Sequence, residues 1–444
     1  MRHRRFIRVA GVVCGLALLT AACGDDGDDT SSEPDATTTT GAAGAEGGEL
    51  AGMKGTTPLV DLSDDFKNRM LEVDPKLVDF NYGAESYDAT IIISLAAAKA
   101  GTDGSAFANE INGITRGGEK CDTFAACMAI IDAGGDPDYD GASGPLEFSG
   151  NGEPTVASYG ILTFGDDNQI DDDATEFQVA NAPESADVPQ EPVTVERAGD
   201  GELKIGTLLP ETGSLAFLGP PEFAGVDLAA KEINDAGGVL GKPIVVDHGD
   251  SGDTTTDLAN QTVDRLLAGN ADAIIGAASS GVSSTVIDKI TAAGVVEFSP
   301  ANTSKAFSTY ADKGLYFRNA PSDILQGAVL GEVIAADGIT TVGILALDDP
   351  YGTGLAEDLQ AALESSGVEV VKTIIYDPAA PSFDTQVQDI VAADPEGIVI
   401  IGFDESSRIL AGLVEQNAGP RDKAVYGVDG NMGNALGDNF NAGK

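Results

Sequence analysis

Histidine is almost absent from this sequence, whose 444 residues include only His3 and His248. His3 lies in an N-terminal leader, so we expect the mature chain to keep His248 alone. Metal sites built from several histidines are therefore excluded, and a Ser-His-Asp triad would depend on this one residue. His248 closes an apolar run at 244–248, and we interpret it as a hydrogen-bonded loop residue.

Basic residues are also scarce, with 25 Lys and Arg against 72 Asp and Glu, for a net charge of -47. Loss of residues 1–22 would remove several arginines and make the chain more acidic. Such a chain repels the phosphates of nucleic acids and the head groups of anionic lipids. We interpret the charge as a solvated acidic surface suited to high salt, and we expect no nucleic-acid partner.

Nucleotide-binding loops are missing as well. The sequence contains no Gly-x-x-x-x-Gly-Lys-Ser/Thr run, and the glycines at 276 and 281 lack the spacing of a dinucleotide fingerprint. Together with the single mature histidine, this argues against an enzyme.

One loop has the spacing of a calcium site. Its matching residues are Asp136, Asp138, Asp140, Gly141 and Glu147, as in an EF-hand. The residues around Glu147 indicate a strand, whereas an EF-hand loop leads into a helix. We therefore expect no metal site and no other cofactor.

The N-terminus lacks an apolar run long enough to span a bilayer. Several arginines precede a short apolar stretch at 9–19, and Thr-Ala-Ala-Cys ends it at Cys23. This pattern resembles a bacterial lipobox and predicts a lipoprotein signal peptide at 1–22 with a lipid on Cys23. The alternative is an ordinary cleaved signal with an incidental cysteine. Residues 23–48 have almost no large apolar side chains, so we expect a disordered tether.

Only four cysteines occur, and two of them, Cys14 and Cys23, lie in or next to the leader. Cys121 and Cys127 remain, six positions apart, in a chain that we expect to be exported into an oxidising compartment. We predict a disulfide between them. Because the loop is short, its stabilising effect should be modest.

From residue 203 onward, short apolar β-rich runs alternate with segments of helical spacing. The first set has strands at 204–209, 244–248, 273–276 and 295–299, with helices at 223–233, 258–267 and 282–292. The second set has strands at 342–347, 368–376, 397–402 and 424–428, with helices at 354–363, 383–391 and 408–415. This alternation predicts an α/β fold with two parallel sheets, each covered by helices on both faces.

The opening of this region, LKIGTLLPETG at 203–213, resembles the type 1 periplasmic binding proteins of ABC importers, nearest the leucine/isoleucine/valine group. The sequence reaches Lys444 before that fold is complete. If residues 47–148 are read directly after Lys444, they resemble the remaining part of the family's sequence. The resemblance implies two Rossmann-like lobes joined by a hinge, in a circularly permuted chain. Compact domains tolerate such exchanges because their termini often lie close together. A misassembled or fused gene is the alternative.

In this arrangement, lobe one comprises residues 80–149 and 203–322. Lobe two comprises residues 49–79, 150–180 and 323–444. Residues 181–202 form a linker between the former ends of the fold.

Two polar segments follow strands of lobe one, at 276–283 and 299–303. The first also opens a helix, so backbone N–H groups and hydroxyls should gather at the carboxyl edge of the sheet, where open α/β folds bind ligands. Helix capping alone is the simpler explanation, since serine and threonine are preferred N-caps. The resemblance implies that Ser280, Ala301 and Thr303 bind a ligand carboxylate.

Three residues end strands of lobe two across the expected cleft. The resemblance implies that Tyr351 and Phe403 form an aromatic wall and that Asp429 binds an ammonium group. Phe403 departs from the tyrosine often found there, which removes a hydroxyl.

Together these features predict an extracytoplasmic, lipid-anchored solute-binding protein, not an enzyme. It should bind a small amino acid of branched-chain type, act as a monomer, and deliver its ligand to an ABC permease. A receptor that senses amides, urea or other small carboxylates without transport is the alternative.

Overall fold

The computed structural model describes residues 48–183 and 188–444 of the chain. The predicted signal peptide at 1–22, Cys23 and the predicted tether up to residue 47 lie outside these described residues. None of the described helices is long and apolar enough to cross a membrane.

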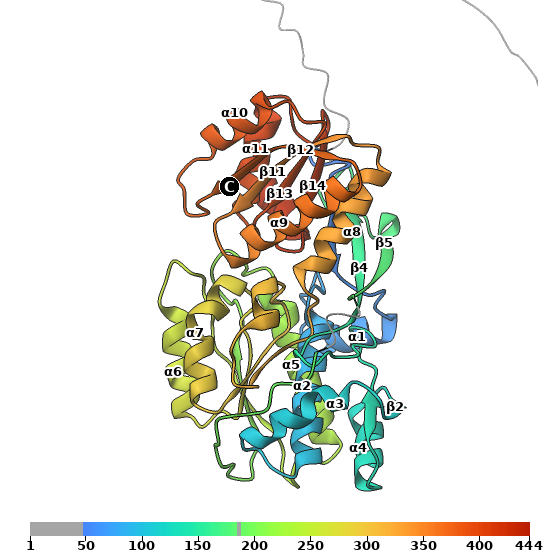
Figure 1. Ribbon diagram of the computed structural model, residues 1–444, viewed down its shortest axis with the longest axis vertical. Helices are drawn as coiled ribbons and strands as arrows, with labels where there is room; N and C mark the ends of the chain where they lie inside the picture. The colour runs from blue at the N-terminus through green and yellow to red at the C-terminus, as the bar shows by residue number, and fades with distance from the viewer. Residues whose placement is uncertain (1–47, 184–187) are drawn as a thin grey trace, which may run out of the picture. The chain divides into compact units, whose positions relative to one another are not determined.

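The first sheet has five parallel strands (Figure 1). In spatial order they are β10 (Tyr316–Arg318), β9 (Val296–Ser299), β8 (Ala273–Gly276), β6 (Lys204–Leu208) and β7 (Val245–Asp247). The buried strand β8 carries apolar side chains on both faces, because Ile275 packs with one group of helices and Ile274 with the other. A sheet covered on both sides requires such continuous apolar strands.

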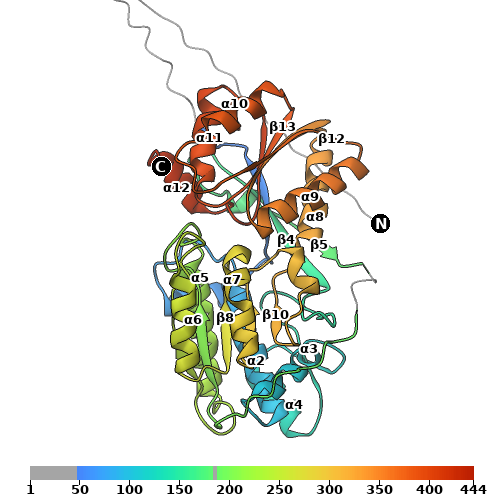
Figure 2. The same cartoon turned by 60° about the vertical axis from the view of Figure 1, so that its left-hand side comes forward.

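Helices cover both faces of this sheet (Figure 2). One face carries α2 (Gly83–Ala100) and α5 (Gly219–Asp235), and the other carries α6 (Leu258–Ala268) and α7 (Ser280–Ala292). Smaller elements complete this part, which we call lobe one: η1 (Ser105–Glu110), α3 (Ile111–Ile114), β2 (Glu119–Cys121), α4 (Phe124–Asp132), β3 (Pro137–Tyr139) and η4 (Lys305–Thr309).

The second sheet has seven strands and defines lobe two. In spatial order they are β12 (Glu369–Tyr376), β11 (Thr341–Leu347), β13 (Gly397–Ile401), β14 (Ala424–Gly427), β1 (Lys54–Pro58), β4 (Val156–Thr163) and β5 (Glu176–Asn181). The first five are parallel, and β4 is antiparallel to both β1 and β5. A short helix, η2 (Asp172–Ala174), lies between β4 and β5 in sequence.

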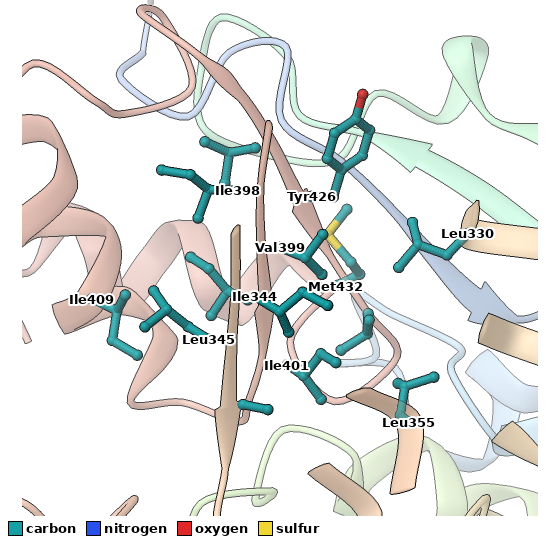
Figure 3. Packing of buried hydrophobic residues seen from close by; sticks show 14 of the residues in the cluster. Leu330, Ile344, Leu345, Leu355, Ile398, Val399, Ile401, Ile409, Tyr426 and Met432 are labelled. Atoms are coloured by element: carbon teal, nitrogen blue, oxygen red, sulfur yellow. The ribbon is translucent and has the colours of Figure 1, made fainter. Parts of the chain in front are cut away.

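Helices also cover both faces of the second sheet. They are α8 (Asp323–Ala336) and α9 (Pro350–Ser365) on one face, and α10 (Asp384–Ala392), α11 (Ser406–Glu415) and α12 (Asn434–Asn441) on the other. Figure 3 shows Ile409 of α11 beside Leu345 on one side of the strands, with Leu330 and Leu355 on the other.

The N-terminal region contributes to both lobes. Its strand β1 lies between β14 and β4, and its helix α2 packs against α5. The helix α1 (Asp64–Val73) begins at its N-cap Ser63. The sequence assigned it to lobe two, but its apolar residues Phe66 and Met70 pack in the core of lobe one. The spacing of its apolar residues could not assign α1 to a lobe. An apolar stripe shows that one face of a helix is buried, but not which lobe it packs against.

The predicted linker at 181–202 starts in lobe two, where Asn181 ends β5 and the N–H of Ala182 donates to the carbonyl of Thr155, and its residues 188–202 are docked along lobe one. The N–H of Thr194 donates to the carbonyl of Lys313. Asp103 accepts hydrogen bonds from the N–H groups of Asp200 and Gly201, and Arg197 pairs with the buried carboxylate of Asp272 at 2.6 Å. These contacts make residues 188–202 a strap that belongs to the lobe.

The first and last described segments meet at Asn168, in the loop between β4 and β5. Its Oδ1 accepts the N–H of Leu50 at 2.9 Å, and its Nδ2 donates to Oδ1 of Asn441 at 2.7 Å. One side chain thus bridges the two ends of the described chain.

The predicted disulfide between Cys121 and Cys127 is present, with an S–S distance of 2.06 Å. It joins the end of β2 to α4, and both sulfur-bearing residues are buried.

Candidate functional site

The two polar segments of lobe one meet at the carboxyl edge of its sheet, as the sequence predicts. The side-chain amide of Asn302 donates to the carbonyls of Ala277 and Ala278, at 3.0 and 2.8 Å. The N–H of Ser304 donates to Oγ of Ser280 at 3.3 Å. These bonds tie the loop that follows β9 to the first turn of α7.

Helix capping accounts for only part of this arrangement. Ser279 is the N-cap of α7 and accepts the N–H of Val282 at 3.3 Å. Thr303 has no such role: it is buried, and within the described residues its Oγ1 has no hydrogen-bond partner. A buried hydroxyl without a partner is costly, so Thr303 is suited to meeting a group that enters from outside.

Lobe two contributes an aromatic wall and a carboxylate. The rings of Tyr351, at the start of α9, and Phe403, after β13, stack with centroids 5.6 Å apart and planes 8° apart. Asp429 follows β14 and is 4% exposed. Its Oδ1 accepts the hydroxyl of Tyr351 and its Oδ2 that of Tyr82, both at 2.7 Å.

Burial raises the pKa of Asp429, while the hydrogen bonds from Tyr351 and Tyr82 oppose that rise. Burial also raises the pKa of both tyrosines, and the charge of Asp429 adds to this effect. Both phenols therefore stay protonated and act as donors. A buried carboxylate held by neutral donors still lacks a positive partner, which is what a ligand ammonium would supply.

All six residues that the sequence proposed as ligand contacts line one cavity of about 20 Å³. This volume is room for about one water molecule. The complete lining is Tyr82, Leu215, Leu218, Ala278, Ser279, Ser280, Ala301, Thr303, Tyr351, Phe403, Asp429 and Gly430. A second cavity, of about 360 Å³, shares Ser279 and Phe403 with the first and is also lined by both lobes.

Sequence reasoning missed Tyr82, Leu215 and Leu218. The two leucines lie in the loop between β6 and α5. The sequence signal that could have identified them is an apolar pair in a loop with Gly and Ser that follows a strand. Tyr82 precedes α2 in the left-handed conformation, with φ 59°. That backbone is unfavourable for a bulky residue and is typical of functional positions, but the sequence does not reveal it.

The calcium-type loop holds a lysine in place of an ion. The Nζ of Lys120 donates to Asp138, Asp140 and Glu147 at 3.1, 2.9 and 3.1 Å. Among the residues that the structure describes, these three carboxylates converge closely enough to bind a metal. The loop backbone is held by Asp88, which accepts the N–H groups of Ala142 and Ser143. An internal cation thus offsets part of the negative charge of these carboxylates.

His248 lies outside the lining of the small cavity and is hydrogen-bonded, as expected. Its two ring nitrogens lie 3.2 Å from Oγ1 of Thr207 and 3.0 Å from Oδ1 of Asp227.

The fold and site define a two-lobed α/β protein with a small polar and aromatic cavity between its sheets. A sequence model described as "Periplasmic binding protein" matches residues 202–437, more than half of the chain. The chain belongs to the periplasmic binding protein family. This is a family of solute-binding proteins, not enzymes, and membership implies a location outside the cytoplasm.

Curated relatives are also similar to part of the chain. "Chemotactic signal transduction system substrate-binding protein BasB" of Halobacterium salinarum is 29% identical over 229 residues, covering 49% of this chain and 53% of that protein. "Leu/Ile/Val-binding protein homolog 1" of Brucella abortus is 31% identical over 173 residues, covering 38% of this chain and 45% of that protein. The chain thus spans about half the length of these relatives.

Solved structures of binding proteins are also similar. The branched-chain amino acid transporter substrate-binding protein LivJ of Streptococcus pneumoniae, in complex with isoleucine, has a TM-score of 0.48 at 26% identity, covering 54% of this chain and 68% of that one. A solute-binding protein of R. palustris, in complex with 4-hydroxybenzoate, has a TM-score of 0.47 at 15% identity, covering 55% and 66%.

Proposed function

We propose that this chain is a lipid-anchored solute-binding protein of an ABC importer and that it binds a small amino acid of branched-chain type between its lobes. The observation that carries this proposal is the pairing of opposite chemistries in one cavity. The unpartnered hydroxyl of Thr303 and the start of α7 at Ser280 face a ligand carboxylate from lobe one, while Asp429 faces an ammonium from lobe two. A free α-amino acid carries both groups a short distance apart.

The apolar side of the cavity supports a small aliphatic side chain. Leu215 and Leu218 contribute from lobe one and the ring of Phe403 from lobe two. The present cavity of about 20 Å³ is too small for an amino acid, so the lobes must part to admit one. Ligand binding would then select the closed state through contacts made to both lobes at once.

A thermal-shift screen tests the ligand class. The panel comprises aliphatic, acidic and basic amino acids, with amides, urea and hydroxybenzoates as competitors. At a hundred times its Kd, a ligand should add about 2.7 kcal/mol to the free energy of unfolding. Asp429→Ala should weaken binding of the best amino acid by about 2 to 5 kcal/mol, because the ammonium would be buried without its partner. Unchanged affinity in that variant would refute both the ammonium site and the ligand class.

A sensing receptor is the second candidate. It is favoured by the likeness to a chemotactic substrate-binding protein, BasB. Membrane vesicles that contain the partner permease and ATPase distinguish the two functions. Ligand uptake that depends on this protein supports transport, whereas binding without uptake supports sensing.

We also propose that the protein is a monomer. A single species of monomer mass in solution would agree with this proposal.

The anchor is proposed from Cys23, which precedes the described residues. Mass spectrometry of the membrane fraction should find the mature N-terminus at Cys23 with acyl chains attached. Cys23→Ser should release the protein from the membrane, as expected when the acyl chains provide the attachment.

We also propose that the chain is circularly permuted. The N-terminal strand β1 lies beside the C-terminal strand β14 in one sheet, and Asn168 bridges the segments at both ends. The strap at 188–202 would then join the former ends of the fold.

A further inference from the structure

A cavity of about 260 Å³ lies between the cores of the two lobes and shares no lining residue with the proposed ligand cavity. We call it the outer cavity. Leu162 and Ile170 in its lining belong to the core of lobe two, whereas Leu62 belongs to the core of lobe one. A molecule bound in the outer cavity would therefore contact both lobes at once.

The walls of the outer cavity are largely apolar, and part of them is exposed. Leu59 and Met432 line it from lobe two. Two further apolar residues of its lining are exposed: Phe177 is 43% exposed and Val78 is 76% exposed. Exposed apolar side chains that gather around a hollow are typical of binding sites. The cavity therefore suits a ligand with an apolar body.

Two carboxylates of the outer cavity lie close enough to repel each other. Asp79 accepts the N–H and the Nδ2 of Asn434 at 3.3 and 2.7 Å, and Asp172 begins η2 at an exposed position. Burial raises the pKa of Asp79; the bonds from Asn434 oppose that rise, and the charge of Asp172 adds to it. Within the described residues, neither carboxylate takes part in a salt bridge. An ammonium group beside both carboxylates would relieve their repulsion.

The other charged residues of the lining do not reverse this preference. Asp61 adds a third carboxylate, and Lys67 is the basic residue among the described residues of the lining. The Nζ of Lys67 lies 6.0 Å from the centre of the Phe80 ring, where a cation–π attraction holds it. Three carboxylates against one ammonium favour a cationic ligand over an anionic one.

The chain segments that form the outer cavity continue into the ligand cavity. The Nδ2 of Asn81 donates to the carbonyl of Met432 at 3.1 Å, and Tyr82, the next residue, donates to Asp429 at 2.7 Å. These two segments belong to different lobes. A ligand in the outer cavity would stabilise the arrangement in which both bonds are made. This is also the arrangement that places Asp429 opposite the lobe-one part of the ligand cavity.

We propose that the outer cavity is a second binding site, which takes a small primary amine with an apolar body and thereby strengthens amino-acid binding. The ammonium pairs with Asp79 and Asp172, and the apolar body packs against Leu162 and Ile170. The strengthening rests on the proposed amino-acid function, whereas the amine site itself does not. By linkage, the amino acid should strengthen amine binding by the same factor.

Three probes with the same ring test the chemistry of the site. Benzylamine, benzyl alcohol and benzoate are each titrated by calorimetry in the absence of amino acid. Benzylamine should bind about fivefold more tightly than benzyl alcohol, as expected for a partly exposed ion pair, and benzoate should bind most weakly. Equal affinities, tightest binding of benzoate, or no binding of benzylamine would each overturn the proposal.

A charge-reversed variant locates the bound amine. Asp172→Lys should weaken benzylamine binding by about tenfold, because its own ammonium would repel that of the ligand. Asp173→Lys makes the same change at the next residue, which is exposed and does not line the cavity. This control should stay within about twofold of the parent, since salt screens exposed charges. Thermal unfolding verifies that each variant is folded.

A third variant excludes binding of the amine in the ligand cavity. Asp429→Ala should bind benzylamine as the parent does, because Asp429 does not line the outer cavity. Loss of benzylamine binding in Asp429→Ala, together with full binding in Asp172→Lys, would place the amine in the ligand cavity and overturn the inference.

The coupling is measured by titrating the best amino acid from the screen with and without saturating benzylamine. Its Kd should fall by about fivefold in the parent and in Asp173→Lys, at the lower end of typical coupling between sites, and should not change in Asp172→Lys. An unchanged or higher Kd in the parent would overturn the coupling. If no amino acid binds at all, the proposed function is wrong, while the three probes still decide whether the amine site exists.

Discussion

The hydroxyl of Tyr82 donates a 2.7 Å hydrogen bond to Oδ2 of Asp429, joining residues 347 positions apart in the sequence. Tyr82 stands at the N-terminus of α2 in lobe one, and Asp429 follows β14 in lobe two. Tyr351 makes the matching bond to Oδ1 from within lobe two. The same carboxylate is thus held once across the lobes and once inside its own lobe.

This asymmetry predicts different effects for two matched variants. Tyr82→Phe and Tyr351→Phe each remove one donor to Asp429 and should weaken amino-acid binding by about 2 kcal/mol. Only Tyr82→Phe also removes a bond between the lobes, so it alone should shift the ligand-free protein toward more open states. Small-angle scattering of the free variants measures this shift. Equal radii of gyration for the two variants would contradict the prediction.

The permutation can be tested with a variant whose segments are rearranged into the order of the unpermuted fold. A variant that begins at Val188, so that it keeps the strap, continues through Lys444 into Gly48 and ends at Asn181 should fold and bind the same ligand. Because Asn168 already bridges Leu50 and Asn441, a short Gly/Ser joint should span the new junction. Circular dichroism and ligand titration provide the measurements. Failure to fold with joints of several lengths would count against the permutation.

The disulfide should contribute to stability but not to ligand binding. Replacing Cys121 and Cys127 together with alanine should lower the free energy of unfolding by about 2 kcal/mol, as the short loop implies. Binding should be unchanged, because neither cysteine lines the ligand cavity. Chemical denaturation compares the two proteins under oxidising conditions. A large loss of affinity in the folded variant would be unexpected.

Stability should decrease as the pH rises from 6 to 8, partly because of Glu85. Burial raises the pKa of this α2 carboxyl to about 8, and the nearby Asp88 adds to the rise. A raised pKa means that the folded state holds a proton which the unfolded chain has already lost. Stability due to Glu85 is complete below its ordinary pKa and is lost as pH approaches about 8, by up to about 1.4 kcal/mol per pH unit.

Glu85→Gln should flatten this slope, and Glu415→Gln, at an exposed position on α11, is the matched control. Urea unfolding at pH 6, 7 and 8 gives the slopes. The three acids whose pKa rises to about 6, Asp272, Asp312 and Asp349, lose their protons near the start of this range. Identical slopes for the parent and Glu85→Gln would refute the assignment.

Strands with strong apolar runs were predictable from the sequence, and their bounds agree within a residue or two. The run at 273–276 is β8 and the run at 397–402 contains β13. By contrast, α8 was missed. Its sequence is apolar on most sides because both the sheet and α9 pack against it, so it lacks a clear helical stripe.

Site residues that directly follow a strand were predictable from the sequence, whereas site residues in loops were not. Ser280 and Asp429 follow buried strands, and the resemblance assigned their roles. Tyr82 and Leu218 enter the cavity from segments without a strand or helix period. The strand β5 was missed because its edge position leaves it largely exposed, and Phe177 and Val179 give only a weak alternation.

The lysine beside the calcium-type loop determines how this loop responds to metal ions and to salt. Because Nζ of Lys120 donates to Asp138, Asp140 and Glu147, these carboxylates are held together by a cation that belongs to the chain. These ion pairs are partly exposed, so dissolved salt screens them, but no chelator can remove the lysine. Metal depletion should therefore leave the shape of this surface unchanged, whereas high salt should loosen it.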